Sequence, residues 1–161
     1  MLNTLKTVFT LIAVLGLLSG CSSSKKKQEA APAAAPVVET PVSQGINVDA
    51  LKAAADAAGN VFYFEFDSFV LTEQTRAALL AHAEYLKAAP RSLRLEGHAD
   101  ERGSREYNMA LGEKRAAAVK DFLASQGVSS AVEVVSFGEE QPAEKGHAEG
   151  SWSKNRRVEL K

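Results

Sequence analysis

The sequence has one cysteine, almost no net charge and no apolar run long enough to cross a membrane. Because Cys21 is alone, an internal disulfide is excluded. A net charge of −1 over 161 residues provides no field that would attract nucleic acid, and basic residues interleaved with aromatic ones are also lacking. The apolar stretch from Thr7 to Leu18 has 12 residues, whereas a membrane-spanning helix needs roughly 20. This composition fits one modest globular domain with additional segments.

The three histidines are not spaced as metal ligands. No two of His82, His98 and His147 lie four residues apart or at a comparable zinc spacing, so we predict no metal site. A hydrolase could use His98 as a base and Ser104 as a nucleophile. No arrangement that would stabilise an oxyanion is visible around them, so we predict no catalytic residues, no cofactor and no enzymatic activity.

The first 20 residues have the layout of an export signal. Lys6 supplies the positive start, and the apolar run that follows has the length of a signal peptide's central region. The run ends in Leu18-Ser-Gly-Cys21, which resembles the bacterial lipobox, where a lipid is attached to the cysteine before cleavage. We therefore predict a lipoprotein signal peptide over residues 1–20 and lipid attachment at Cys21.

Residues 21–45 are rich in Ala, Pro, Val and Thr and show no apolar periodicity, which predicts a disordered, flexible tether. Several acyl chains would give stable anchoring, because a single chain binds a membrane only marginally. Lipoproteins retained in the inner membrane are associated with Asp after the cysteine, and here the residue is Ser22. By resemblance, we expect an outer-membrane lipoprotein whose domain faces the periplasm.

Residues 46–161 alternate between helical and strand patterns. Helices are predicted at 48–58, from Thr72 to about 88, and from about 105 to 125, with one helical turn near Ser151. Strands are predicted at 61–66, 93–99, 132–137 and 157–161. In the first strand, Phe62, Phe64 and Phe66 share one face. After the first helix the order is β-α-β-α-β-β, which predicts an α/β (α+β) two-layer sandwich with a mixed sheet.

An arginine lies on the apolar face of the predicted helix 105–125. At 100° per residue the apolar stripe is formed by Tyr107, Leu111, Ala118 and Phe122. Arg115 falls inside this stripe and Asn108 falls at its edge. Burying a guanidinium is costly unless an anionic group meets it, so Arg115 requires a partner.

Asp100 follows the strand 93–99, at the end of the sheet where open α/β folds bind ligands. One interpretation is a pocket for a zwitterion, in which Asp100 accepts from an ammonium and Arg115 grips a carboxylate. The other is an internal Asp100–Arg115 salt bridge that closes the start of the helix. Periodicity alone leaves both interpretations open.

Several spaced motifs now indicate a family. They are Phe64-Glu-Phe-Asp-Ser68, Gly97-His-Ala-Asp-Glu-Arg-Gly103, Glu106-Tyr-Asn108, Leu111-Gly-Glu-Lys-Arg-Ala116, Ser136-Phe-Gly138 and Asn155-Arg-Arg-Val158. Their order resembles that of OmpA-like peptidoglycan-binding domains. With the lipobox and tether, the whole chain is similar to the peptidoglycan-associated lipoproteins of the Tol–Pal system.

The resemblance implies binding without catalysis. The ligand would be the diaminopimelate of peptidoglycan stem peptides, gripped by Asp100 and Arg115, with Arg102, Asn108 and the Phe66-Asp67 turn around it. It also implies a TolB-like periplasmic partner, other Tol proteins, and a role in envelope integrity and cell division. On this basis, Asp100→Ala or Arg115→Ala should abolish retention on sacculi and leave the fold intact. The alternative is a lipoprotein adaptor or assembly factor that uses the fold for protein contacts only.

Overall fold

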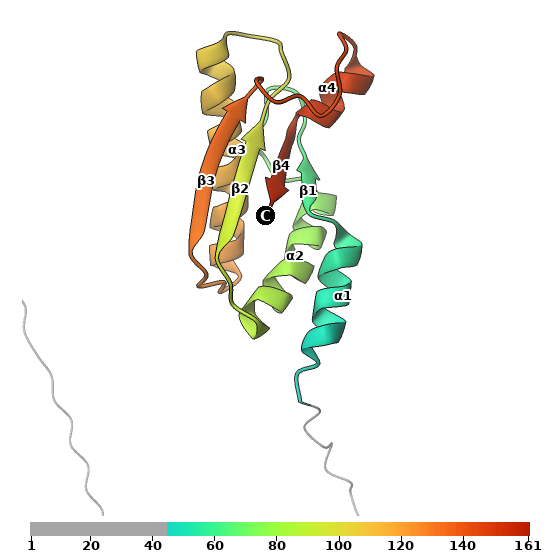
Figure 1. Cartoon of the computed structure of the whole chain (residues 1–161), viewed down its shortest axis with the longest axis vertical. Helices are drawn as coiled ribbons and strands as arrows, with labels where there is room; N and C mark the ends of the chain where they lie inside the picture. Colours follow the sequence, from blue (N-terminus) through green and yellow to red (C-terminus); the bar gives the residue numbers. More distant parts are fainter. Residues whose placement is uncertain (1–44) are drawn as a thin grey trace, which may run out of the picture. The chain divides into compact units, whose positions relative to one another are not determined.

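The computed structural model describes residues 45–161, so the predicted signal peptide, Cys21 and nearly all of the predicted tether lie outside the described residues. Four helices and four strands follow one another in this part of the chain (Figure 1): α1 (Val48–Ala58), β1 (Val61–Tyr63), α2 (Glu73–Ala88), β2 (Leu93–His98), α3 (Arg105–Ser125), β3 (Val132–Gly138), α4 (Glu149–Asn155) and β4 (Arg157–Leu160).

The four strands form one mixed sheet in the order β1-β4-β2-β3. Strands β2 and β3 are parallel, whereas β4 is antiparallel to both of its neighbours, β1 and β2. The last strand of the chain therefore lies in the interior of the sheet. Helices α2 and α3 lie on the same side of this sheet (Figure 1). The predicted two-layer α/β sandwich with a mixed sheet is confirmed.

Side-chain caps define where the three longer helices begin. Asn47 accepts a hydrogen bond from the amide of Ala50 at 3.0 Å, and Thr72 accepts one from Thr75 at 3.1 Å. Ser104 does the same for Tyr107 at 3.2 Å. Each cap satisfies an amide that has no partner within its helix. The predicted bounds of helices 48–58 and 105–125 agree with α1 and α3.

The core lies between the sheet and helices α2 and α3. Leu79, Leu95, Val119 and Val158 are completely buried in it. The face that α3 turns towards the sheet carries Asn108, Leu111, Gly112, Arg115, Ala116, Val119 and Leu123. The predicted apolar stripe was therefore partly wrong, since Tyr107 is 49% exposed and Asn108 is buried.

Two glycines account for the face that α3 turns towards the sheet. A Cβ atom on Gly97 of β2 would lie 1.9 Å from the carbonyl oxygen of Gly112 on α3. Helix and strand thus touch through their backbones at this point. A pattern of apolar side chains cannot reveal such a contact, because the residues that make it have no side chain.

Strand β1 ends at Tyr63, earlier than the prediction of 61–66. The amide of Phe64 still donates to the carbonyl of Arg156 at 3.0 Å, and then the chain turns. Asp67 has a φ of 53°, in the left-handed region that Asp tolerates better than most residues. Consequently Phe62 and Phe64 are buried but Phe66 is 56% exposed, and the prediction that all three share one face was wrong for Phe66.

Candidate functional site

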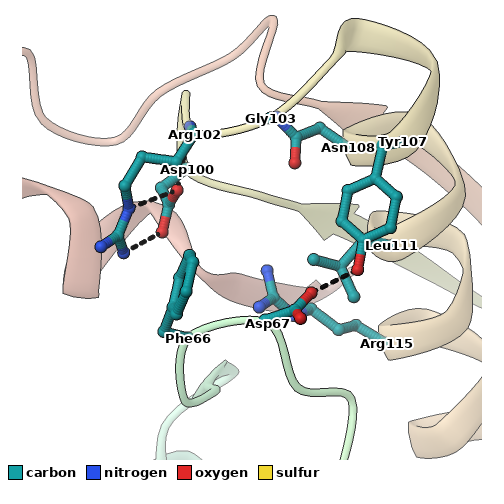
Figure 2. A pocket seen from close by; sticks show the side chains of 9 residues that line it. All are labelled: Phe66, Asp67, Asp100, Arg102, Gly103, Tyr107, Asn108, Leu111 and Arg115. Atoms are coloured by element: carbon teal, nitrogen blue, oxygen red, sulfur yellow. Dashed lines mark hydrogen bonds and ion pairs between the residues drawn. The ribbon is translucent and has the colours of Figure 1, made fainter.

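The turn after β1 and the loop after β2 meet at the same end of the sheet. Both strands are antiparallel to β4, so they run in the same direction and their carboxyl ends coincide. A cavity of about 240 Å³ lies there, between these loops and the first turns of α3. It is lined by Phe66, Asp67, Asp100, Arg102, Gly103, Tyr107, Asn108, Leu111 and Arg115 (Figure 2). All six predicted ligand-binding residues are among them.

Arg115 is completely buried and holds three main-chain carbonyls. Its Nε donates to the carbonyl of Ser68 at 2.8 Å, and its Nη2 donates to that of Glu65 at 3.1 Å. These two residues flank the Phe66-Asp67 turn. Nη1 donates to the carbonyl of His98 at 2.8 Å. One guanidinium therefore ties the turn after β1 to the end of β2.

These bonds change the role that the sequence predicted for Arg115. The internal Asp100–Arg115 salt bridge, one of the two open interpretations, is not formed. Burial lowers the pKa of Arg115 to about 10, so the side chain remains charged at neutral pH. Removing it would take a charged donor away from three carbonyls. We therefore expect Arg115→Ala to weaken the fold, in contrast to the expectation from the sequence.

Asp100 is 4% exposed and accepts four hydrogen bonds. Oδ1 accepts from the amide and the Nε of Arg102, both at 3.1 Å, and Oδ2 accepts from Arg102 Nη2 at 2.7 Å and Arg156 Nη1 at 3.3 Å. Burial raises the pKa of this carboxyl, but the hydrogen bonds from the two arginines outweigh it and the pKa is lowered overall. Asp100 is thus a charged acceptor at neutral pH.

Arg156 bonds to Asp100 and was not predicted as a site residue. It is 4% exposed, and besides Asp100 it donates to the carbonyl of Phe64 at 3.0 Å and to the carboxylate of Glu149. The Asn155-Arg-Arg157 motif drew attention to this segment. Its contact with Asp100 could not be inferred, because 56 residues separate the two in the chain.

Arg102 lies between two aromatic rings. The carbon at the centre of its guanidinium is 4.0 Å from the ring centroid of Phe66 and 4.1 Å from that of Trp152. Such stacking favours a cation on both ring faces. The indole of Trp152 in turn donates to Glu101 at 3.0 Å. Trp152 therefore helps to orient a residue that lines the cavity, a role that the sequence did not reveal.

The remaining wall comes from the start of α3. The hydroxyl of Tyr107 donates to Asp67, and the amide nitrogen of Asn108 donates to Glu139. The bond to Asp67 raises the pKa of Tyr107, which stays neutral. Among the charged residues in the lining, Arg102 and Arg115 are cations while Asp67 and Asp100 are anions. The cavity is therefore suited to a small ligand that carries both signs of charge.

Two further observations concern membrane-spanning helices and metal sites. Within residues 45–161, no helix combines the length and apolar character that crossing a bilayer requires. The same part of the chain contains no group of three or more His, Cys, Asp or Glu side chains placed to hold a metal ion.

The OmpA family matches residues 63–156 of this chain, which include the whole cavity. A peptidoglycan-associated lipoprotein of Pseudomonas aeruginosa is 56% identical over 109 residues, which is 67% of this chain and 65% of that protein. The protein of the same name from Pseudomonas putida is 46% identical over 157 residues, covering 94% of this chain and 93% of the relative.

A solved structure of a relative has a similar fold. The crystal structure of the peptidoglycan-associated lipoprotein from Burkholderia pseudomallei matches with a TM-score of 0.62 and 48% identity. The match covers 64% of this chain and 89% of that one. The similarity therefore includes the sequence of the domain as well as its architecture.

Proposed function

The chain belongs to the OmpA family, as a peptidoglycan-associated lipoprotein of the cell envelope. We propose that it anchors the outer membrane to the cell wall. The ligand would be the diaminopimelate of an uncrosslinked stem peptide, bound without covalent chemistry in the cavity beside Asp100 and Arg115. Proteins of this family are structural and not enzymes, so we assign no catalytic role to Ser104 or His98.

The observation that carries this proposal is the pairing of charges around the cavity. The free end of diaminopimelate bears an ammonium and a carboxylate on one carbon atom. The lining offers two cations and two anions within a single cavity of about 240 Å³. A zwitterion can therefore meet an opposite charge at each of its groups without adding net charge to a half-enclosed site.

Arg115 has donors to spare for the carboxylate. A guanidinium has five N–H groups, and the three carbonyls of Glu65, Ser68 and His98 use one each. Two remain for a ligand. Because Arg115 is held by backbone atoms, its position is fixed before the ligand arrives, which reduces the entropy lost on binding.

Asp100 has no spare acceptor site. A carboxylate offers about four lone pairs, and Asp100 already accepts four hydrogen bonds. An ammonium at Asp100 must therefore take the place of one donor. Arg102 is the one that can move, because its side chain is 30% exposed whereas that of Arg156 is 5% exposed.

The remaining parts of the proposal rest on the family resemblance. We assign lipid attachment to Cys21, a linking role to residues 21–45, and an outer-membrane location with the domain facing the periplasm. The partners would be a TolB-like periplasmic protein and other Tol proteins, and the role would extend to envelope integrity and cell division. One tether joins the lipid to the domain. A domain released from the cell wall therefore stays near it, and the high effective concentration favours rebinding.

Sedimentation with purified sacculi tests the proposal. The full chain in detergent should co-sediment, and free diaminopimelate should release it. Asp100→Ala and the isosteric Asp100→Asn should both lower retention, since losing half of a buried charge pair costs about 2–5 kcal/mol, or roughly 30- to several thousand-fold in affinity. Asp121→Ala, an exposed acid on α3, serves as the control. Background retention of the native chain would instead favour the adaptor alternative.

A further inference from the structure

A second, smaller cavity adjoins the one described above. It has a volume of about 80 Å³ and is lined by Asp67, Phe69, Tyr107, Ala110, Leu111 and Lys114. Three of these residues, Asp67, Tyr107 and Leu111, also line the larger cavity. A ligand that extends beyond the first cavity along this shared wall enters the second directly.

The second cavity lies where the surface is most apolar. Of the eight large apolar side chains that are exposed within residues 45–161, Phe66, Phe69, Val70 and Tyr107 belong to this end of the molecule. Phe69 is 47% exposed and faces α3 across the cavity. On α3, Ala110 presents only a methyl group. The space beside it accommodates a side chain about as small as alanine.

One cation borders this apolar space. The Nζ of Lys114 lies 5.8 Å from the centroid of the Phe69 ring. Among the described residues, no carboxylate lies within 4.0 Å of this ammonium. The nearby carboxylate of Asp67 instead accepts from the Tyr107 hydroxyl. Lys114 is thus available to a carboxylate that a ligand brings.

We propose that this second cavity binds the alanine residue that follows diaminopimelate in a stem peptide. Its methyl group would lie between Phe69 and Ala110, and its terminal carboxylate would pair with Lys114. This inference rests on the proposed function, because it extends the same ligand by one residue. In the stem peptide, a chain of methylene groups joins the free end of diaminopimelate to the carbon whose carboxyl group forms the peptide bond to alanine, so the ligand can follow the shared wall from the first cavity to the second.

Titration calorimetry of the full chain with two soluble peptides tests the inference. One peptide ends in diaminopimelate with its terminal carboxyl group amidated, and the other carries one further D-alanine with a free carboxylate. The native chain should bind the longer peptide about threefold to fivefold more tightly, the range of a partly exposed ion pair. Lys114→Gln should remove this difference while leaving the affinity for the shorter peptide unchanged, and Lys114→Arg should keep it.

Two further variants separate the possible outcomes. Lys120→Gln, at another exposed position on α3, should change nothing, whereas Ala110→Leu should fill the space and weaken only the longer peptide. Equal affinity of the native chain for both peptides would overturn this inference and leave the proposed function standing. Failure to bind either peptide would overturn the proposed function itself.

Discussion

The floor and the rim of the larger cavity each contain arginine, but their side chains are held in different ways. The floor comprises the lining residues Asp100 and Arg115 together with Arg156, which bonds to Asp100 from outside the lining; all three are at most 4% exposed. Its arginines bond to main-chain carbonyls of two separate segments, residues 64–68 and the end of β2 at His98. The rim, formed by Phe66, Arg102 and Tyr107, is substantially exposed, and its side chains contact mainly one another and carboxylates.

This difference separates two demands on one site. A ligand-binding group must be placed accurately, and backbone carbonyls place the floor because they belong to the fold itself. The rim must allow a ligand to enter and to compete with the donors on Asp100. We therefore expect substitutions in the floor to affect both stability and binding, and substitutions in the rim to affect binding alone.

The largest expected effect is that of Arg115→Ala. Three carbonyls lose a buried charged donor, so we expect the free energy of unfolding to fall by more than about 3 kcal/mol, together with loss of sacculus binding. Urea unfolding followed by circular dichroism measures the first effect. Arg91→Ala, at an exposed position between α2 and β2, is the control. An unchanged unfolding midpoint for Arg115→Ala would mean that the floor is not part of the fold.

Gly97→Ala tests whether the floor depends on close contact between β2 and α3. The new Cβ would collide with the backbone of Gly112, which cannot move away alone. We expect a loss of about 3 kcal/mol in unfolding free energy and weaker binding, because α3 carries Arg115. Gly150→Ala adds its methyl group to open space and should be neutral in both assays. If Gly97→Ala were as neutral as Gly150→Ala, the face that α3 turns towards the sheet would need another explanation.

His98 makes the stability of the floor dependent on pH. Its carbonyl is held by Arg115, and both ring nitrogens are buried without a hydrogen-bond partner in the described part of the chain. Burial lowers its pKa from 6.5 to about 4, and the nearby Arg157 and Lys161 outweigh the opposing effect of Glu159. The unfolded state therefore binds the proton more tightly, and stability falls as the pH drops below about 6.5.

The expected loss is about 2 kcal/mol between pH 7 and pH 5. It can be measured as the shift of the urea midpoint across this range. His98→Phe keeps the stacking on Phe137 and has no titrating group, so it should remove this part of the pH dependence. An identical slope in the variant would show that other groups are responsible.

Tyr107→Phe should have the smallest effect on the fold. It removes one exposed hydrogen bond to Asp67, so we expect stability to change by less than about 0.5 kcal/mol. Peptide affinity, measured by calorimetry, should still fall because Asp67 becomes free to reorient. A stability loss as large as that of Gly97→Ala would remove the distinction between rim and floor.

Local signals predicted much of this architecture. Asn47, Thr72 and Ser104 are residues that favour helix starts, and each caps the helix that follows it. The alternation of apolar residues located all four strands. Strand β1 was predicted too long because its pairing with β4 ends at Tyr63 and Arg157, and nothing in the pattern Phe62-Tyr-Phe-Glu-Phe66 shows where a distant partner strand begins.

The sequence predicted residues that line the cavity but not the contacts between them. Asp100 and Arg115 were paired on charge, yet Arg115 bonds to carbonyls, which every residue has and which therefore leave no mark in a sequence. Arg156 was missed for a related reason, since its bond to Asp100 depends on how the strands are ordered. Charge patterns thus identified Asp100 and Arg115 without showing how they are held in place.

The place of β4 in the sheet has a consequence for how the domain is made. β4 is the last of the four strands along the chain, yet it joins β1 to β2. As the chain is synthesised or threaded through a pore, β1 emerges early and stays without a neighbour until β4 arrives about 100 residues later. Arg156 and Asp100 meet only at that moment. The contact that fixes Asp100 beside the cavity is thus formed only when this late segment of the chain folds into place.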